Sequence, residues 1–539
     1  MQAQATQRSD VPSAQKVADP AMMVLGPSVN IAQPPARALT RIVATIGPAS
    51  EHPDTVAKLI QAGVSIFRFN FSHGSFEDHK RRLDTVRGVA KLLRTPTACM
   101  GDLQGPKIRV GKVPSPGIEL VAGRDVIIRP GAEVATTESW SGEQVVVLPT
   151  TYKQLVDEVE PGHRVLINDG LIRMLAVARA PDRGELLCRV TVGGLVTSGK
   201  GINLPQSQIS AKAITDKDWE CVHWAVEHGL DLLALSFVRT ADEVLELKHA
   251  LSGMCSIDRT KADHVADAGG ASRIPVVAKI EKPQAVNNIE EIVEAADVIM
   301  VARGDLGVEM DISQVPVAQK SIIASCQHLA KPCIVATQML ETMVESATPT
   351  RAEASDVGNA IFDGADAIML SAETATGKHP VLVVETMRRI ADTAESFIAK
   401  GPERHGPPTR WRGSFDGVAA LAHGAKYVAK DIGASLIACW SESGGAARVL
   451  SMFDFNIPII AYSSDVRASR RMIVNRGVIP IVATPPASGI VADWIEQANR
   501  DLIQRGLAKP GDRAVMIAGK PVGQVGAVQA IVIHMFTPA

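Results

Sequence analysis

The sequence predicts an α/β protein whose central unit is a closed barrel of eight strand–helix repeats. Eight short apolar segments, rich in β-branched residues, begin near residues 41, 64, 97, 231, 275, 297, 332 and 365, and a helical segment follows each one except where a different domain intervenes. Polar residues gather directly after these segments, as they do at the C-terminal face of (β/α)8 barrels. A doubly wound open sheet would place them less uniformly. We therefore expect a (β/α)8 TIM barrel over residues 39–106 and 209–395.

The elements of the barrel follow from hydrophobic periodicity and from turn residues. We expect strands at 41–46, 64–71, 97–103, 231–237, 276–280, 297–302, 332–337 and 365–370, and helices at 55–62, 76–93, 216–228, 241–251 and 289–296. Asn288, with Glu291 three residues later, predicts a capping box at the start of the last of these helices. Residues 303–307 predict a tight turn, and the Gly-, Asp- and Ser-rich residues 252–272 predict a surface loop.

A change in the hydrophobic periodicity between residues 107 and 208 predicts an inserted β domain. Long helical patterns stop there, and short strands are expected at 126–129, 144–148, 164–167, 171–177 and 186–192. Asn168-Asp169-Gly170 between two of these strands is a strong hairpin signal, because these residues accept the left-handed conformation of a tight turn. We expect a small β-barrel domain that interrupts the larger barrel.

The end of the chain predicts a separate α/β domain over residues 414–539, after a linker at 396–413. A helix is expected at 416–431, and strands at 435–440, 457–462, 478–483, 513–518 and 530–535. Small and hydroxyl residues follow two of these strands: Ser441, Glu442, Ser443 and Gly444 in one place, and Gly519, Gly523 and Gly526 in the other. Such loops either cradle a phosphate with backbone N–H groups or are ordinary turns.

Composition excludes several classes of function. A net charge of -2 gives no excess of basic residues for binding nucleic acid, and an aromatic content of 4% offers few side chains on which bases could stack. No apolar run approaches the roughly 20 residues that a membrane helix needs. The seven cysteines form no CxxC pair, which favours buried thiols in a reducing, cytoplasmic setting. Residues 1–38 are rich in Ala, Gln, Pro and Ser without periodicity, and we expect a disordered tail.

The stretch 276–310 carries the main chemical signal. Lys279 and Glu281 stand at the end of one buried strand, and Asp305 follows the next. Because parallel strands joined by a helix end side by side, these three charges are expected to meet at one rim. Two carboxylates and an ammonium there suit a divalent metal with an anionic ligand. A salt-bridge network that closes the sheet is an equally valid interpretation of these residues alone.

Eleven segments together resemble the pyruvate kinase family, from about residue 39 to the C-terminus. They are IVATIGPAS, FRFNFSHG, DLQGPKIR, NDGLI, KGINLP, SFVR, AKIEKPQ, MVARGDLGVE, ATQMLETM, PTRAEASDV and IMLSAETA, in the family's order. The resemblance implies a catalytic barrel, a β lid domain and a C-terminal regulatory domain. It also implies phosphoryl transfer from phosphoenolpyruvate to ADP with Mg²⁺ or Mn²⁺, and a homotetramer with a phosphorylated effector in the C-terminal domain.

The resemblance also implies roles for individual residues. Glu281 and Asp305 match metal ligands, and Lys279 and Arg68 match the cations that hold the transferring phosphate. Gly304 and Asp305 match the turn that receives the substrate carboxylate. Thr337 matches a threonine beside the substrate methylene carbon, and we expect a water relayed by Thr337, Ser371 and Glu373 to protonate the enolate. The positions that match the nucleotide site are Asn70, His73, Arg109 and Lys200.

The sequence departs from the family pattern in two places. Members that need K⁺ bind it at positions matching Asn70, Ser72, Asp102 and Leu103, with Thr commonly at the position of Leu103 and Glu at that of Lys107. Leu103 and Lys107 resemble the K⁺-independent branch, in which a fixed ammonium replaces the mobile cation. The loop after 435–440 keeps Ser441 and Ser443 but continues with Gly445, Ala446 and Ala447, so the effector's identity stays open.

Two other functions fit parts of the sequence. A metal-dependent aldolase or lyase that stabilises a pyruvate enolate would use the same pair of carboxylates, but it would not need Arg109 or Lys200. A catalytically silent metabolite sensor would rest on the C-terminal domain, and the presence of Lys279, Glu281 and Asp305 argues against it. Formation of ATP from ADP separates the three functions.

Overall fold

The computed structural model describes residue 25 and residues 38–140, 142–257, 273–401, 416–525 and 528–538. Most of the expected tail at 1–38, most of the expected linker at 396–413 and residues 258–272 lie outside these ranges, as does Gly526. Within them, no helix combines the length and the apolar character that a membrane span requires. Six of the cysteines are buried free thiols, at positions 99, 188, 221, 326, 333 and 439.

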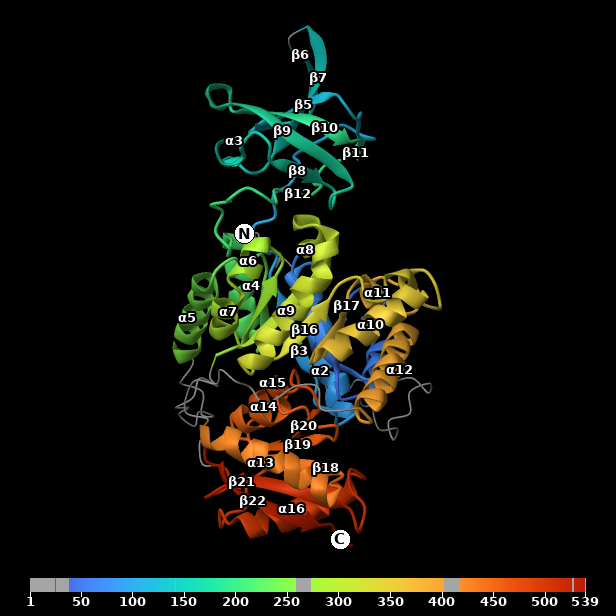
Figure 1. Cartoon of the computed structure of the whole chain (residues 1–539), viewed down its shortest axis with the longest axis vertical. Coiled ribbons are helices and arrows are strands. Elements are labelled where there is room, and N and C mark those ends of the chain that lie inside the picture. The colour runs from blue at the N-terminus through green and yellow to red at the C-terminus, as the bar shows by residue number, and fades with distance from the viewer. Residues whose placement is uncertain are drawn as a thin grey trace, which may run out of the picture.

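Eight parallel strands close into the expected barrel (Figure 1). They are β1 (Arg41–Thr45), β2 (Val64–Asn70), β3 (Ala98–Asp102), β13 (Leu232–Leu235), β14 (Val276–Ile280), β15 (Val298–Ala302), β16 (Cys333–Ala336) and β17 (Ala367–Leu370), in the spatial order β1-β17-β16-β15-β14-β13-β3-β2. Their side chains face two apolar layers, one inside the barrel and one under the helices. This packing fixes the strand ends, and the residues after them share one rim.

The helices that cover the barrel are α1 (Pro53–Ala62), α2 (Phe76–Leu92), α4 (Asp216–Glu227), α5 (Ala241–Ile257), α7 (Ile289–Ala295), α9 (Val315–His328), α10 (Arg351–Asp363) and α12 (Pro380–Ile398). Capping boxes start three of them, at Ser75, Thr215 and Thr350. Each box satisfies backbone N–H groups that the first helical turn leaves without partners.

Three local expectations were wrong. Residues 303–307 do not form a tight turn but open a helix, α8 (Arg303–Glu309). Asn288 stands at the N-cap position of α7 without capping it, because its Nδ2 instead donates to the carbonyl oxygen of Arg239 at 3.0 Å. Residues 252–257, expected in a loop, continue α5.

The inserted domain lies beyond the C-terminal ends of the barrel strands (Figure 1). The strands pair as a seven-stranded sheet in the order β12-β8-β9-β10-β5-β7-β6 and as a separate pair, β11-β4. Bridges from Arg109 to Gly201 and from Val110 to Thr150 connect the β12 edge of this sheet with β7, in agreement with the expected small β-barrel. The strands are β4 (Ile118–Leu120), β5 (Asp125–Pro130), β6 (Thr136–Trp140), β7 (Glu143–Thr150), β8 (Arg164–Ile167), β9 (Ile172–Ala180), β10 (Glu185–Val192), β11 (Gly194–Val196) and β12 (Ile202–Asn203), with one short helix, α3 (Leu155–Glu158). The Asn168-Asp169-Gly170 hairpin is confirmed, since it joins antiparallel β8 and β9 with φ values of 55°, 54° and 81°.

The C-terminal domain packs against the opposite, N-terminal end of the barrel (Figure 1). Its elements are α13 (Asp416–Ile432), β18 (Leu436–Trp440), α14 (Gly445–Ser451), β19 (Ile459–Ser463), α15 (Val466–Met472), β20 (Val478–Val482), α16 (Val491–Gln504), β21 (Arg513–Gly519) and β22 (Val528–Met535). The sheet order is β20-β19-β18-β21-β22, with β22 antiparallel. Arg41 of β1 donates to the carbonyl oxygen of Asn475 at 3.2 Å, which ties the two domains together.

Candidate active site

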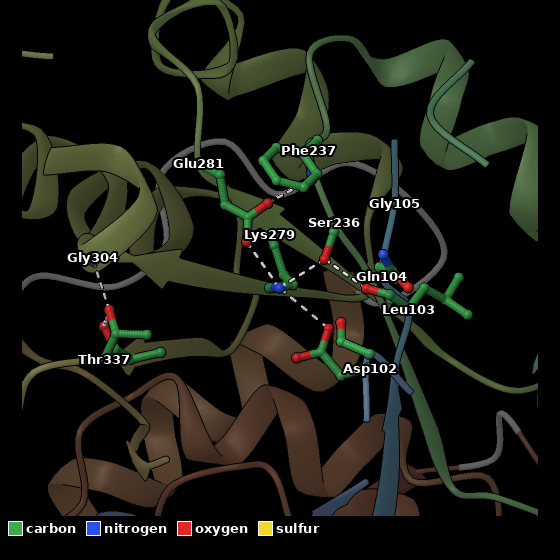
Figure 2. A network of polar contacts seen from close by, with 12 residues as sticks. Asp102, Leu103, Gln104, Gly105, Ser236, Phe237, Lys279, Glu281, Gly304 and Thr337 are labelled. Atoms are coloured by element: carbon green, nitrogen blue, oxygen red, sulfur yellow. Dashed lines mark hydrogen bonds and ion pairs between the residues drawn. The ribbon is translucent and has the colours of Figure 1, made fainter. Parts of the chain in front are cut away.

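Lys279, at the C-terminal end of β14, is the centre of the charged rim (Figure 2). Its Nζ lies 2.8 Å from Oε1 of Glu281 and 3.2 Å from Oδ1 of Asp102, and it donates to Oγ of Ser236 at 2.7 Å. Burial acts to lower the pKa of Lys279, but the charges of Asp102 and Glu281 outweigh it and hold the pKa above its ordinary value. The ammonium is therefore permanently charged in a pocket where 8% of the residue is exposed.

Asp102, at the end of β3, connects this ammonium to a guanidinium. Its Oδ2 accepts from Nε of Arg68 at 2.6 Å, and Arg68 also donates to Oγ1 of Thr45 at 3.1 Å. Burial acts to raise the pKa of Asp102, yet Lys279 and Arg68 hold it below its ordinary value. Two fixed cations, Arg68 on β2 and Lys279 on β14, therefore face the rim and share one buried carboxylate on β3.

Glu281 and Asp305 form a carboxylate pair. Glu281 is 1% exposed, and its Oε2 accepts from the backbone N–H of Phe237 at 2.7 Å. Burial raises the pKa of Glu281, and the negative charge of Asp305 raises it further against the effect of Lys279. Phe237 holds its N–H toward Glu281 with φ at 55°, a conformation that costs free energy and is typical of functional sites.

This donor set fits a hard divalent cation. Two carboxylates that repel each other across a buried rim would be stabilised by a 2+ charge between them, and both supply only oxygen ligands. Among the described residues no group of three or more His, Cys, Asp and Glu side chains is placed to hold a metal. Mg²⁺ commonly takes one or two carboxylates from a protein and completes its coordination with waters and substrate oxygens.

Thr337 and Gly304 meet beside this pair (Figure 2). Oγ1 of Thr337 accepts from the backbone N–H of Gly304 at 2.7 Å and donates to the carbonyl oxygen of Ala336 at 2.6 Å. A Cβ at Gly304 would approach Oγ1 of Thr337 to 3.2 Å, so a larger residue there would press on the hydroxyl that bonds Gly304. The sequence placed both residues at the rim but did not indicate that they bond to each other.

Arg303 is a residue that the sequence analysis did not single out. Its Nη2 donates to the carbonyl oxygens of Thr337 and Gln338, at 2.9 and 3.1 Å, and its Nη1 lies 2.7 Å from Oδ2 of Asp356. Thr337 and Gln338 have φ values of 69° and 55°. The guanidinium thus holds a strained turn in place, and the only signal in the sequence was a charge directly after a buried strand.

Ser371 and Glu373 follow β17 at the same rim. Glu373 is 2% exposed and accepts from the backbone N–H groups of Ser371 at 2.6 Å and of Leu340 at 3.3 Å. Burial raises the pKa of Glu373, and these hydrogen bonds only partly offset it. A carboxyl with a raised pKa is suited to hold a proton near neutral pH.

The four nucleotide-site candidates lie in two groups. Asn70 ends β2 of the barrel and His73 follows it, and Oδ1 of Asn70 accepts from the backbone N–H of Ser72 at 3.1 Å. Arg109 and Lys200 lie at the base of the inserted domain, where Nη1 of Arg109 donates to the carbonyl oxygen of Gly199 at 2.8 Å. Within the described residues, no hydrogen bond or ion pair joins one group to the other.

A cavity of about 430 Å³ separates the inserted domain from the barrel. Asp305 and Phe237 border it from the barrel, and so do Lys282 and Glu309, which the sequence analysis did not select. Lys282 and Asn203 of the inserted domain both bond to Oε1 of Glu309, at 2.6 and 2.8 Å. The volume falls within the roughly 300–1,000 Å³ of small-molecule sites.

Leu103 and Lys107 lie near this cavity in different surroundings. Leu103 is buried, and its carbonyl oxygen accepts from Oγ of Ser236 at 2.7 Å. Lys107 is exposed, borders the cavity, and forms no ion pair with any residue that the structure describes. Among the described residues, the ammonium that lies between the rim carboxylates Asp102 and Glu281 is that of Lys279.

A (β/α)8 barrel with this charged rim, facing a cavity under an inserted β domain, defines a barrel enzyme for an anionic substrate. Family models described as the barrel domain and the alpha/beta domain of pyruvate kinase match residues 37–384 and 419–534. The chain belongs to the pyruvate kinase family. It is thereby a phosphotransferase with phosphoenolpyruvate and ADP as substrates, in a family that needs a divalent metal, and the aldolase and sensor interpretations are set aside.

Individual pyruvate kinases are similar to this chain over most of its length. The chain is 37% identical to pyruvate kinase of Mycobacterium tuberculosis over 92% of its own length and 98% of that protein. It is also 37% identical to pyruvate kinase of Geobacillus stearothermophilus, over 92% of this chain and 80% of that protein. The crystal structure of a pyruvate kinase from Cryptosporidium parvum superposes with a TM-score of 0.79 at 30% identity, covering 93% of this chain and 96% of that one.

Proposed function

We propose that the chain transfers the phosphoryl group of phosphoenolpyruvate to ADP at the rim around Lys279, between the barrel and a lid formed by residues 107–208. The observation that carries this proposal is the position of one buried ammonium, 2.8 Å from Glu281 and 3.2 Å from Asp102. Fixed charges aimed at a transferring phosphate account for most of the catalysis in this reaction class.

Glu281 and Asp305 are the proposed ligands of the divalent metal, Mg²⁺ or Mn²⁺. When bound, the ion neutralises negative charge that develops on the phosphoryl oxygens. Lys279 and Arg68 hold the phosphoryl group in line with its acceptor. The backbone N–H of Gly304 would donate to the substrate carboxylate, and for this it must release Oγ1 of Thr337.

Thr337, Ser371 and Glu373 are the proposed route for the proton that converts the enolate to pyruvate. Oγ1 of Thr337, once it no longer accepts from Gly304, is free to bond a water, and Glu373, whose pKa is raised by burial, lies at the same rim. In this route water carries the proton to the methylene carbon, and the three side chains position that water.

Asn70 and His73 of the barrel and Arg109 and Lys200 of the lid are the proposed nucleotide contacts. Since two of them belong to the barrel and two to the inserted domain, ADP would connect the lid to the barrel. Glu309 already links Lys282 to Asn203 of the inserted domain, and it supports the lid while the phosphate groups enter.

Regulation and assembly complete the proposal. The barrel, at 39–106 and 209–395, would be followed by a linker at 396–413 and a regulatory domain at 414–539. A phosphorylated effector would bind to the regulatory domain, four copies would form a tetramer, and the enzyme would act in the cytoplasm. Support for these points comes from family membership alone.

The same proposal includes independence from K⁺, because Leu103 offers no hydroxyl ligand and Lys107 supplies a fixed cation where K⁺-dependent members commonly carry a Glu. A coupled assay on the purified chain with phosphoenolpyruvate, ADP and MgCl₂ should give full turnover without K⁺. Tetramethylammonium chloride at matched ionic strength is the control. A large rise in turnover on adding KCl would falsify the K⁺ prediction, and no ATP formation under either condition would overturn the proposed reaction.

A further inference from the structure

Four charged side chains beside the cavity come from two elements of the barrel. Glu281 and Lys282 directly follow β14, while Asp305 and Glu309 lie four residues apart on α8. Side chains with this spacing share one face of a helix, with about 5–6 Å between their Cβ atoms. Lys282, Asp305 and Glu309 all border the cavity of about 430 Å³, and Figure 1 shows α8 at the end of the barrel that faces the inserted domain. The flexible side chain of Lys282 can therefore pair with either carboxylate of α8.

The structure pairs Lys282 with Glu309. Nζ of Lys282 lies 2.6 Å from Oε1 of Glu309, and Nδ2 of Asn203 in the inserted domain donates to the same oxygen at 2.8 Å. Glu309 is 1% exposed, and a carboxylate this deeply buried is strongly destabilised when it loses its cationic partner. The ion pair therefore holds the ammonium of Lys282 at one end of α8.

Asp305, one helical turn away, is left without such a partner. Within the part of the chain that the structure describes, Asp305 forms no ion pair, whereas Glu281 already pairs with Lys279 at 2.8 Å. A divalent cation needs carboxylate oxygens that are free to coordinate it. An ammonium on Asp305 would occupy one of them and would repel the incoming ion. Holding Lys282 at Glu309 therefore favours binding of the metal.

We propose that Glu309 is a positioning residue for the metal site, because it holds Lys282 so that Asp305 stays available to the divalent cation. This inference rests on the proposed function, which takes Glu281 and Asp305 as the metal ligands. Glu309 itself touches neither the metal nor the substrate. When its charge is removed, the ammonium of Lys282 moves to Asp305, which then serves two cations in place of one.

Binding of Mn²⁺ to the purified full-length chain, followed by electron paramagnetic resonance, tests this inference. Glu309→Gln keeps the shape of the side chain and removes its charge. We expect it to weaken Mn²⁺ binding by about tenfold or more, because an ammonium a few ångströms from a 2+ ion repels it strongly in a partly buried setting. Lys282→Met removes the competing ammonium, so the double variant Glu309→Gln/Lys282→Met should bind Mn²⁺ within about threefold of wild type, as coupled residues predict.

Rescue in the double variant separates positioning from a general disturbance of the rim, which a second substitution would not repair. Equal Mn²⁺ affinity in wild type and Glu309→Gln would overturn the inference, and so would a double variant as weak as Glu309→Gln. Lys282→Met alone should bind Mn²⁺ at least as tightly as wild type. A loss of affinity in Lys282→Met would contradict the inference even if Glu309→Gln failed to fold. Glu345→Gln is the matched control, since Glu345 forms an exposed ion pair with Lys378.

Two further variants assign the effect. Asn203→Ala removes the contact from the inserted domain but keeps the ion pair, so Mn²⁺ affinity should not change. A loss in Asn203→Ala equal to that in Glu309→Gln would show that the contact between the domains controls metal binding, and would overturn the inference. Glu281→Gln reports on the proposed function. If Glu281→Gln weakens Mn²⁺ binding and Glu309→Gln does not, only the inference fails, whereas no loss in Glu281→Gln contradicts the metal site itself.

Discussion

At the scale of single residues, the rim depends on sharing a few charges. Lys279 forms ion pairs with two carboxylates, and Asp102 forms ion pairs with two cations. Glu281 interacts electrostatically with both the ammonium of Lys279 and the carboxylate of Asp305. A buried ion pair gains little stability over an apolar pair, so its value lies in the position of its charges. Here the charges are fixed before the substrate arrives, and no reorganisation is needed during the reaction.

Replacing Lys279 by Met keeps much of the side-chain volume and removes the central charge. We expect turnover to fall by about 10²- to 10³-fold, as for loss of one preorganised group at a transition state. Steady-state assays at saturating phosphoenolpyruvate and ADP measure it. Lys378→Met, on an exposed ion pair with Glu345, should leave turnover unchanged. Activity within threefold of wild type in Lys279→Met would contradict the role given to this ammonium.

Replacing Thr337 by Ala removes the hydroxyl that faces Gly304. We expect slower entry of solvent deuterium into the methyl group of pyruvate, because the proposed water loses its position. Mass spectrometry of pyruvate formed in D₂O measures the rate, and Thr337→Ser, which restores the hydroxyl, is the control. An unchanged exchange rate in Thr337→Ala would remove this residue from the proton route.

At the scale of elements, the two ends of the barrel strands carry residues with different roles. The N-terminal ends of the strands are held by buried carboxylates, such as Asp366 just before β17, whose Oδ2 accepts from the backbone N–H of Cys333 at 2.9 Å. The C-terminal ends carry the rim. Short helices, such as α8, replace loops at this rim and aim backbone N–H groups into the site.

Asp366 makes stability depend on pH. Burial raises its pKa to about 7, from an ordinary value of 3.8, although the hydrogen bond from Cys333 opposes the rise. Between about pH 4 and pH 7 the unfolded chain therefore loses this proton first, and the fold loses stability as the pH rises. Asp366→Asn stays neutral, so its Tm relative to wild type should be higher at pH 8 than at pH 4.5. Thermal unfolding at both pH values measures this, and an equal difference at both would contradict the assignment.

At the scale of the whole molecule, the barrel carries a different domain at each of its two ends. The inserted domain covers the C-terminal rim, and the C-terminal domain covers the N-terminal rim (Figure 1). Strands β14 and β15 run from one to the other, with Asp297 and Arg273 at one end and Lys279 and Glu281 at the other. The parallel strands of the barrel thus connect the interface with the C-terminal domain to the proposed site of phosphoryl transfer.

Much of this could be predicted from the sequence, because strand period and strand-end chemistry are local signals. The eight barrel strands and the meeting of Lys279, Glu281 and Asp305 follow from them. Contacts between residues far apart in the sequence could not be predicted. Examples are the hydrogen bond from Lys279 to Ser236 and the one from Arg303 to the carbonyl oxygen of Thr337. The helix at Arg303 was missed because glycines within it resembled a turn, and tertiary packing outweighed that local preference.

The most direct test of the central claim is the binding of Mn²⁺ to the purified chain, followed by electron paramagnetic resonance. The account predicts one Mn²⁺ per chain in the presence of phosphoenolpyruvate, with affinity at least tenfold weaker in Glu281→Gln and unchanged in Glu345→Gln, which alters an exposed carboxylate. Equal Mn²⁺ affinity in wild type and Glu281→Gln would show that the rim does not hold the metal, and would contradict the account.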